Sequence, residues 1–131
     1  MSNDPVRVLL VDDEPMFLAA VRALLELDDR MVVVGAANNG GDALLVADSE
    51  SPDVALVDLA LPQMDGFETT RRLLEEHPAM KVIAVSGLSD GHAEDAARAA
   101  GAISFLLKGG LHAEIADAIF NASEQPFETR A

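Results

Sequence analysis

The chain has 131 residues, half of them hydrophobic, a length and composition typical of one folded domain with its own core. Its formal net charge of −14 excludes the basic footprint that nucleic acid backbones require, so we expect no direct nucleic acid contact. The absence of cysteine excludes disulfides, thiol catalysis and cysteine-ligated zinc. No apolar stretch reaches the roughly 20 residues of a membrane span, and the N-terminus lacks signal-peptide features. We therefore expect a cytoplasmic protein.

Five short apolar runs predict the strands of a parallel sheet. They are rich in Val, Ile and Leu and are continuous rather than alternating, which is typical of strands buried on both faces. The predicted strands span residues 6–11, 31–34, 54–57, 81–85 and 103–107.

The segments between these runs have the spacing and end signals of helices. The signals are, in chain order, Pro15 at the start of the first helix, Asn39 with Asp42 capping the second, Asp65 opening and Pro78 ending the third, Ser89 capping the fourth before Gly101, and an apolar stripe of Leu111, Ile115, Ile119 and Ala122 in the last.

The strand-helix alternation, repeated five times, predicts an α/β fold. Parallel crossovers of this kind are right-handed and place helices on both faces of a doubly wound, five-stranded sheet. We expect the domain to span residues 1–122. Residues 123–131 are polar, contain Pro126 and predict a tail or the start of a linker.

Chemically reactive side chains follow four of the five predicted strands. Asp58 ends the third run before a turn marked by Pro and Gly, and Asp12-Asp13 end the first. Ser86 and Lys108 follow the fourth and fifth. Because the carboxyl ends of parallel strands meet at one edge, we expect these side chains to converge. A carboxylate cluster of this kind usually holds a hard cation.

Four stretches that carry these residues resemble the receiver domains of two-component response regulators. They are residues 8–14, 57–66, 85–87 and 101–108, and the Lys-Gly-Gly after the last strand is most similar to receivers of the NarL/LuxR type. The resemblance implies a flavodoxin-like receiver fold with strand order 2-1-3-4-5. It also implies a domain that catalyses only its own phosphorylation and dephosphorylation and is not otherwise an enzyme.

The resemblance assigns the central role to Asp58. This residue would accept a phosphoryl group from a histidine kinase or a phosphotransfer protein. Mg²⁺ would bind the carboxylates of Asp13 and Asp58 and the backbone carbonyl of Ala60, while Asp12 places a metal-bound water. Carboxylate and carbonyl oxygens are ligands that suit Mg²⁺.

The resemblance also implies a switch. Lys108 and Ser86 would contact phosphoryl oxygens, and movement of Ser86 would let Phe105 turn inward. The face formed by the fourth helix, the fifth strand and the fifth helix would then change shape. The partner of this face would be an output domain that controls transcription through separate DNA-binding residues, or a second copy of the chain.

Two departures from the usual receiver pattern affect what we expect. Gly109 stands where many receivers have proline, so a cis peptide is not expected, because a non-proline cis bond costs about 2.5–4 kcal/mol. Gly87 replaces a common alanine after Ser86.

Ala60 and Leu88, near the expected acceptor, are apolar and cannot orient a water, which predicts slow self-dephosphorylation.

Two other functions are compatible with parts of the pattern. A receiver-like scaffold would bind its partner without phosphorylation. A hydrolase with an aspartyl-phosphate intermediate also uses Asp and Mg²⁺, but its nucleophile belongs to an Asp-x-Asp motif, whereas Asp12 and Asp13 are adjacent. A nicotinamide-dependent oxidoreductase is disfavoured because no glycine-rich turn follows the first strand.

Overall fold

A computed structural model describes residues 4–87, 91–110 and 114–126 of the chain. Within these residues, five strands alternate with five helices. The elements are β1 (Val6–Val11), α1 (Pro15–Glu26), β2 (Met31–Ala37), α2 (Gly40–Glu50), β3 (Val54–Asp58), α3 (Gly66–Glu76), β4 (Lys81–Ser86), α4 (Gly91–Ala100), β5 (Ser104–Leu107), a short 3₁₀ turn (Lys108–Gly110) and α5 (Glu114–Ser123).

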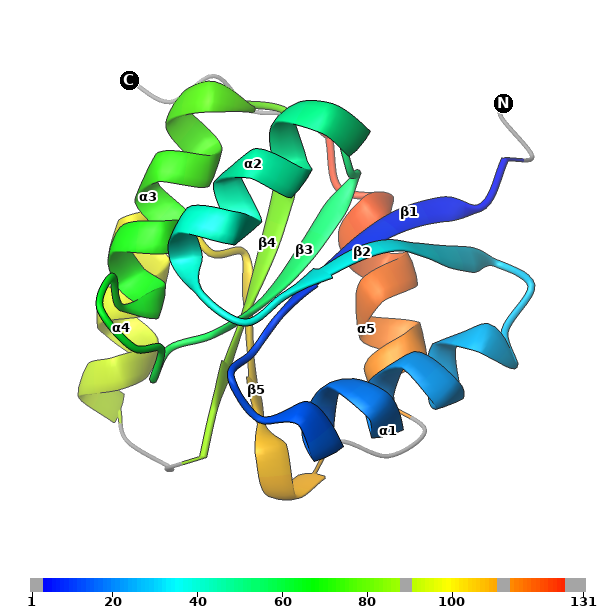
Figure 1. Ribbon diagram of the computed structural model, residues 1–131, viewed down its shortest axis with the longest axis horizontal. Helices are drawn as coiled ribbons and strands as arrows, with labels where there is room; N and C mark the ends of the chain where they lie inside the picture. Colours follow the sequence, from blue (N-terminus) through cyan, green and yellow to red (C-terminus); the bar gives the residue numbers. More distant parts are fainter. Residues whose placement is uncertain (1–3, 88–90, 111–113, 127–131) are drawn as a thin grey trace.

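The strands form one parallel sheet in the order β2-β1-β3-β4-β5 (Figure 1). This confirms both the predicted doubly wound architecture and the strand order that the resemblance implied. The order reverses direction between β1 and β3, and ligands of open α/β sheets bind at such a switch point.

The sheet separates two hydrophobic cores, because successive side chains of a strand point to opposite faces. Leu9 and Val57 belong to the core beneath α2, α3 and α4. Leu10 and Leu56 belong to the core beneath α1 and α5. Figure 1 shows the same division of the helices between the two faces. Burial on both faces explains why the central strands are continuously apolar.

Strand β2 lies at one edge of the sheet and is longer than predicted. It continues for three residues past the predicted range 31–34, because Gly35 and the two alanines after it still pair with β1. Val8 pairs with Val33, but Leu9 pairs with Gly35, so Val34 is an extra residue on the edge strand. This irregularity is a β-bulge.

The helix ends that the structure describes follow the predicted signals. The side chain of Asn39 accepts a hydrogen bond from the N–H of Asp42 at 2.8 Å, and that of Asp65 accepts one from Glu68 at 2.9 Å. Gly101, directly after α4, has a φ of 118°, which favours glycine. The predicted cap Ser89 and the stripe residue Leu111 lie outside the described residues.

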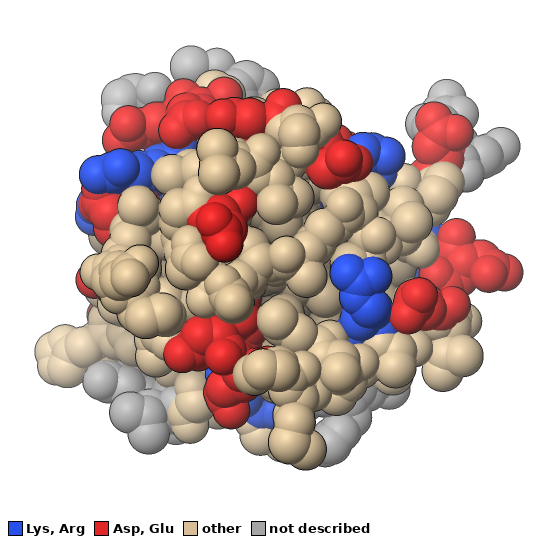
Figure 2. Space-filling model, in the orientation of Figure 1, with Lys and Arg blue, Asp and Glu red and all other residues tan. Residues whose placement is uncertain are grey.

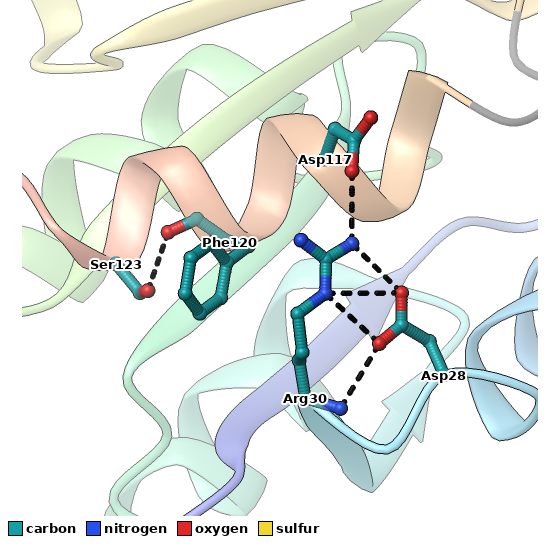
Figure 3. Close-up of polar contacts among 5 residues, drawn as sticks. All are labelled: Asp28, Arg30, Asp117, Phe120 and Ser123. Atoms are coloured by element: carbon teal, nitrogen blue, oxygen red, sulfur yellow. Dashed lines mark hydrogen bonds and ion pairs between the residues drawn. The ribbon is translucent and has the colours of Figure 1, made fainter. Parts of the chain in front are cut away.

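Arg30 joins the α1–β2 loop to α5 (Figure 3). Its guanidinium donates to Asp28 and Asp117, each at 2.8 Å, and its Cζ atom lies 4.8 Å from the ring centroid of Phe120. Hydrogen bonds from Arg30 lower the pKa of Asp28 to about 2, and those to the two aspartates raise the pKa of Arg30. The contact therefore fixes the start of β2 against α5.

The surface reflects the negative charge of the chain. Acidic side chains are spread over the face drawn in Figure 2, and Lys and Arg form no continuous stripe there. This face therefore offers no footprint for a nucleic acid backbone. None of the helices within the described ranges is long and apolar enough to cross a membrane.

Gly66 allows α3 to begin directly against the end of β3. Its N–H donates to the carbonyl of Leu59 at 3.1 Å. A Cβ atom at this position would overlap the carbonyl oxygen of Asp58 and the Cα atom of Leu59. These neighbours are backbone atoms at the sheet edge, so they cannot move aside without displacing the strand end.

We predict that Gly66→Ala lowers the free energy of unfolding by about 1–3 kcal/mol, the range for overpacked sites. Urea denaturation followed by far-UV circular dichroism measures the change, because the chain has no Trp or Tyr. Gly91→Ala is the matched control, since its Cβ would meet no atom of the described residues within 4 Å. Equal stability of the two variants would contradict this account of Gly66.

Candidate functional site

The register of the sheet brings the predicted residues to one edge. Val11 pairs with Val57, so Asp12 and Asp58 follow at the same level on neighbouring strands. Ser86, the last residue of β4, pairs with Leu107, and Lys108 comes directly after it. The carboxyl ends of four strands thus deliver two acids, a hydroxyl and an amine.

Asp58 is buried at the end of β3, with 3% of its surface exposed. Its Oδ1 accepts a hydrogen bond from the backbone N–H of Ala60 at 3.1 Å. Its Oδ2 accepts one from Lys108 Nζ, also at 3.1 Å. A buried carboxylate needs such partners, because an unpaired charge away from water is strongly unfavourable.

Asp12 is equally buried and lies beside Asp58. Its Oδ1 accepts a hydrogen bond from the N–H of Glu14 at 2.8 Å. Its Oδ2 lies 3.0 Å from Lys108 Nζ but, among the residues described, has no hydrogen bond of good geometry. Burial raises the pKa of Asp12, and the Glu14 N–H and Lys108 offset this only in part. The carboxyl therefore has an oxygen available to a further cation.

The ammonium of Lys108 lies at the centre of this group. It contacts the carboxylates of Asp12, Asp58 and Glu14, and it lies 4.7 Å from the ring centroid of Phe17. Burial acts to lower the pKa of Lys108, but the interactions with the three carboxylates outweigh it and raise the pKa. Lys108 is therefore a permanent positive charge in the site.

Oxygen atoms of Asp12, Glu14 and Asp58 all lie within 4.8 Å of one another. The group includes Glu14, which was not among the predicted site residues, although its place directly after two acids at a strand end was informative. Asp13 is exposed and is not in this group. Its role as a metal ligand stays a prediction.

Ser86 and Phe105 lie on the α4 side of the edge. Ser86 is buried at the end of β4. Phe105 is half-buried and packs against the core beneath α2, α3 and α4, opposite Ala84 in the sheet. The two proposed switch residues therefore come from neighbouring strands, but their part in a switch stays a prediction.

The family model of the response regulator receiver domain matches residues 8–120, which include all of these side chains. The chain is a response regulator receiver domain. It is 40% identical over 119 residues to the transcriptional regulatory protein LiaR of Bacillus subtilis, a match that covers 91% of the receiver and 56% of LiaR. It is 38% identical over 111 residues to the nitrate/nitrite response regulator NarL of Escherichia coli, covering 82% of the receiver and 50% of NarL.

Solved structures give the same result. The signal receiver domain of the putative response regulator NarL from Mycobacterium tuberculosis superposes with a TM-score of 0.89 at 32% identity, over 94% of the receiver and 99% of that chain. The receiver spans about half the length of LiaR and NarL. The resemblance to NarL/LuxR-type receivers, inferred from sequence, is thereby confirmed.

We predict that Lys108→Met lowers the free energy of unfolding at pH 7 in EDTA by about 3 kcal/mol, because two buried carboxylates lose their cation. When the pKa of a carboxyl group is higher in the folded state than in the unfolded state, the protein becomes more stable as the pH falls through the folded-state pKa. Because the pKa of Asp12 is already raised, the deficit of the variant shrinks from pH 7 toward pH 4.

Urea denaturation at several pH values measures this difference. Lys81→Met is the control, because the side chain of Lys81 donates only to the backbone carbonyl of Ala79 among the hydrogen bonds described. A deficit that is the same at every pH would contradict the assignment of the loss to buried carboxylates.

Proposed function

We propose that the receiver accepts a phosphoryl group on Asp58 from the phosphohistidine of a histidine kinase or a phosphotransfer protein. One observation carries the proposal: a buried carboxylate at the switch point of the sheet is hydrogen-bonded to a lysine ammonium and lies beside other carboxylates. Phosphoryl transfer requires mainly alignment and charge stabilisation, and this group of residues supplies both.

The same residues fit Mg²⁺. Hard oxygen donors gather within 4.8 Å, and the buried Oδ2 of Asp12 lacks a hydrogen bond among the described residues. We propose that the carboxylates of Asp13 and Asp58 and the carbonyl of Ala60 hold the ion, with Asp12 acting through a bound water. When bound, Mg²⁺ neutralises the carboxylates and orients phosphoryl oxygens.

Asp58 is the nucleophile of the transfer. One of its carboxylate oxygens forms a bond to phosphorus while the bond between phosphorus and the donor breaks, and the electron pair of that bond leaves with the donor. A histidine donor then departs as imidazole, and acetyl phosphate as acetate. The phosphoryl oxygens keep their negative charge, which Lys108 stabilises as a fixed cation beside Asp58.

The response to phosphorylation begins at Ser86 and Phe105. We infer that Ser86 moves to donate a hydrogen bond to a phosphoryl oxygen, because its strand ends at the same edge as Asp58. Phe105 then turns inward into the space released. It has no hydroxyl, so apolar packing alone decides its rotamer. The changed surface is formed by α4, β5 and α5.

This surface serves a protein partner. LiaR is a transcriptional regulatory protein, and the receiver spans 56% of its length. By analogy, we propose that the receiver acts in the cytoplasm and controls transcription through separate DNA-binding residues. The partner of the α4-β5-α5 face is then an output domain or a second copy of the receiver. The charge of −14 accords with a receiver that leaves DNA contact to other residues.

We predict that acetyl phosphate and Mg²⁺ add one phosphoryl group to the wild-type receiver and none to Asp58→Asn. Intact-mass spectrometry measures the adduct, and EDTA abolishes it. Asp29→Asn, which changes an exposed aspartate away from the edge, is the control and retains the adduct.

Other outcomes distinguish the alternative functions. A folded wild-type receiver without any adduct, from acetyl phosphate or from a phosphorylated kinase, contradicts the proposal. Equal binding of a partner by wild type and Asp58→Asn favours a scaffold. Continuous phosphate release from small phosphomonoesters favours a hydrolase.

We predict a phosphoryl half-life of many minutes at Asp58. Ala60, two residues after the acceptor, is exposed and has no side-chain donor or acceptor that could orient an attacking water. Leu88, the other apolar neighbour named from sequence, lies outside the described residues. Intact mass at intervals after donor removal measures the lifetime, and a half-life of seconds would contradict this reasoning.

A further inference from the structure

Glu14 differs from the two other carboxylates around Lys108 because water reaches it. Its side chain is 62% exposed, whereas those of Asp12 and Asp58 are 2% and 3% exposed. Its backbone N–H is held by Asp12 Oδ1 at 2.8 Å, directly before α1 begins. The side chain extends from this fixed point across the site to the Lys108 ammonium.

The ammonium of Lys108 is already surrounded by acceptors. A lysine has three N–H donors, and the carboxylates of Asp12, Glu14 and Asp58 each contact this nitrogen. The ring of Phe17 covers a further side of the ammonium. Two of these contacts are hydrogen bonds, to Glu14 and Asp58, and Asp12 Oδ2 lies 3.0 Å from the same nitrogen. An incoming phosphoryl oxygen therefore binds Lys108 most favourably if one of the three carboxylates withdraws, because it then replaces an acceptor instead of adding a fourth.

Glu14 is the carboxylate that can withdraw most easily. Asp12 and Asp58 are buried at strand ends. If either carboxylate moved away from the ammonium, it would lose a partner and gain no water in return, which is unfavourable. The exposed carboxylate of Glu14 regains full hydration when it turns outward. An exposed ion pair of this kind contributes little free energy and is easily broken.

We propose that Glu14 is a displaceable counter-ion of Lys108, which occupies the phosphoryl position of the ammonium in the unphosphorylated receiver and slows phosphorylation by small anionic donors. The inference rests on the proposed function of Asp58 and adds a regulatory residue to it. The Glu14 carboxylate competes for Lys108 and repels the negative donor at the same place. A protein donor offsets this barrier with contacts elsewhere on the receiver, so Glu14 favours protein donors over small ones.

The test compares Glu14→Gln with wild type in phosphorylation by acetyl phosphate at saturating Mg²⁺, followed by intact mass. Glutamine keeps the length of the side chain and removes its charge. We expect the variant to react about threefold to fivefold faster at 0.1 M ionic strength, the upper part of the range for an exposed ion pair. The gain decreases at 1 M, where the Debye length falls from about 10 Å to about 3 Å.

Glu26→Gln is the matched control. It also removes one negative charge, but from the exposed last residue of α1, the helix that begins directly after Glu14. We expect it to react at the wild-type rate.

A second measurement does not depend on phosphorylation. The NMR signal of the Lys108 ammonium is identified by its absence in Lys108→Met. We expect the Nζ protons of Lys108 to exchange with water faster in Glu14→Gln than in wild type.

The outcomes separate this inference from the function on which it rests. If wild type is phosphorylated and Glu14→Gln reacts at the same rate or more slowly, the counter-ion role is wrong. Slower reaction together with weaker Mg²⁺ binding would instead make Glu14 a metal ligand. If neither protein is phosphorylated by any donor, the proposed function fails and this inference fails with it.

Discussion

The parallel register of β1, β3 and β4 is the constraint on which the rest of the site depends. Pairing of Val11 with Val57 and of Asp58 with Val85 sets the level at which each strand ends. The apolar residues of these strands are buried on both faces, so a shift of register would disrupt the packing of both cores and carry polar residues at the strand ends into them. The hydrophobic core therefore fixes the distances between carboxylates and lysine, although no core residue belongs to the chemistry.

The alternation of side chains divides the edge into two functional sides. Lys108 contacts the ring of Phe17 on α1, so the ammonium and its carboxylates lie toward that helix. Phe105 packs with the opposite core, beneath α2, α3 and α4. The charged groups thus lie on one side of the sheet, and the proposed response of Phe105 takes place on the other.

The sequence alone predicted the strands, the helices and the convergence of Asp12, Asp58, Ser86 and Lys108, because periodicity and strand ends are local properties. It could not decide which of two adjacent aspartates faces the lysine, since that depends on the direction of the chain as it leaves β1. It likewise overlooked Glu14 as a partner of Lys108, because 94 residues separate them. The contacts of Arg30 with Asp117 and Phe120 carry no local signal either.

The bulge at Val34 has a consequence for how this protein behaves at high concentration. Strand β2 leaves one side of the sheet without a partner strand, and its seven residues carry no charged side chain. Such an edge is a template for pairing with another chain and, in the worst case, for aggregation. The extra residue interrupts the regular spacing of N–H and C=O groups, so a second copy finds no long matching ladder. Without the bulge, the edge strand would present a regular ladder of N–H and C=O groups to a second copy.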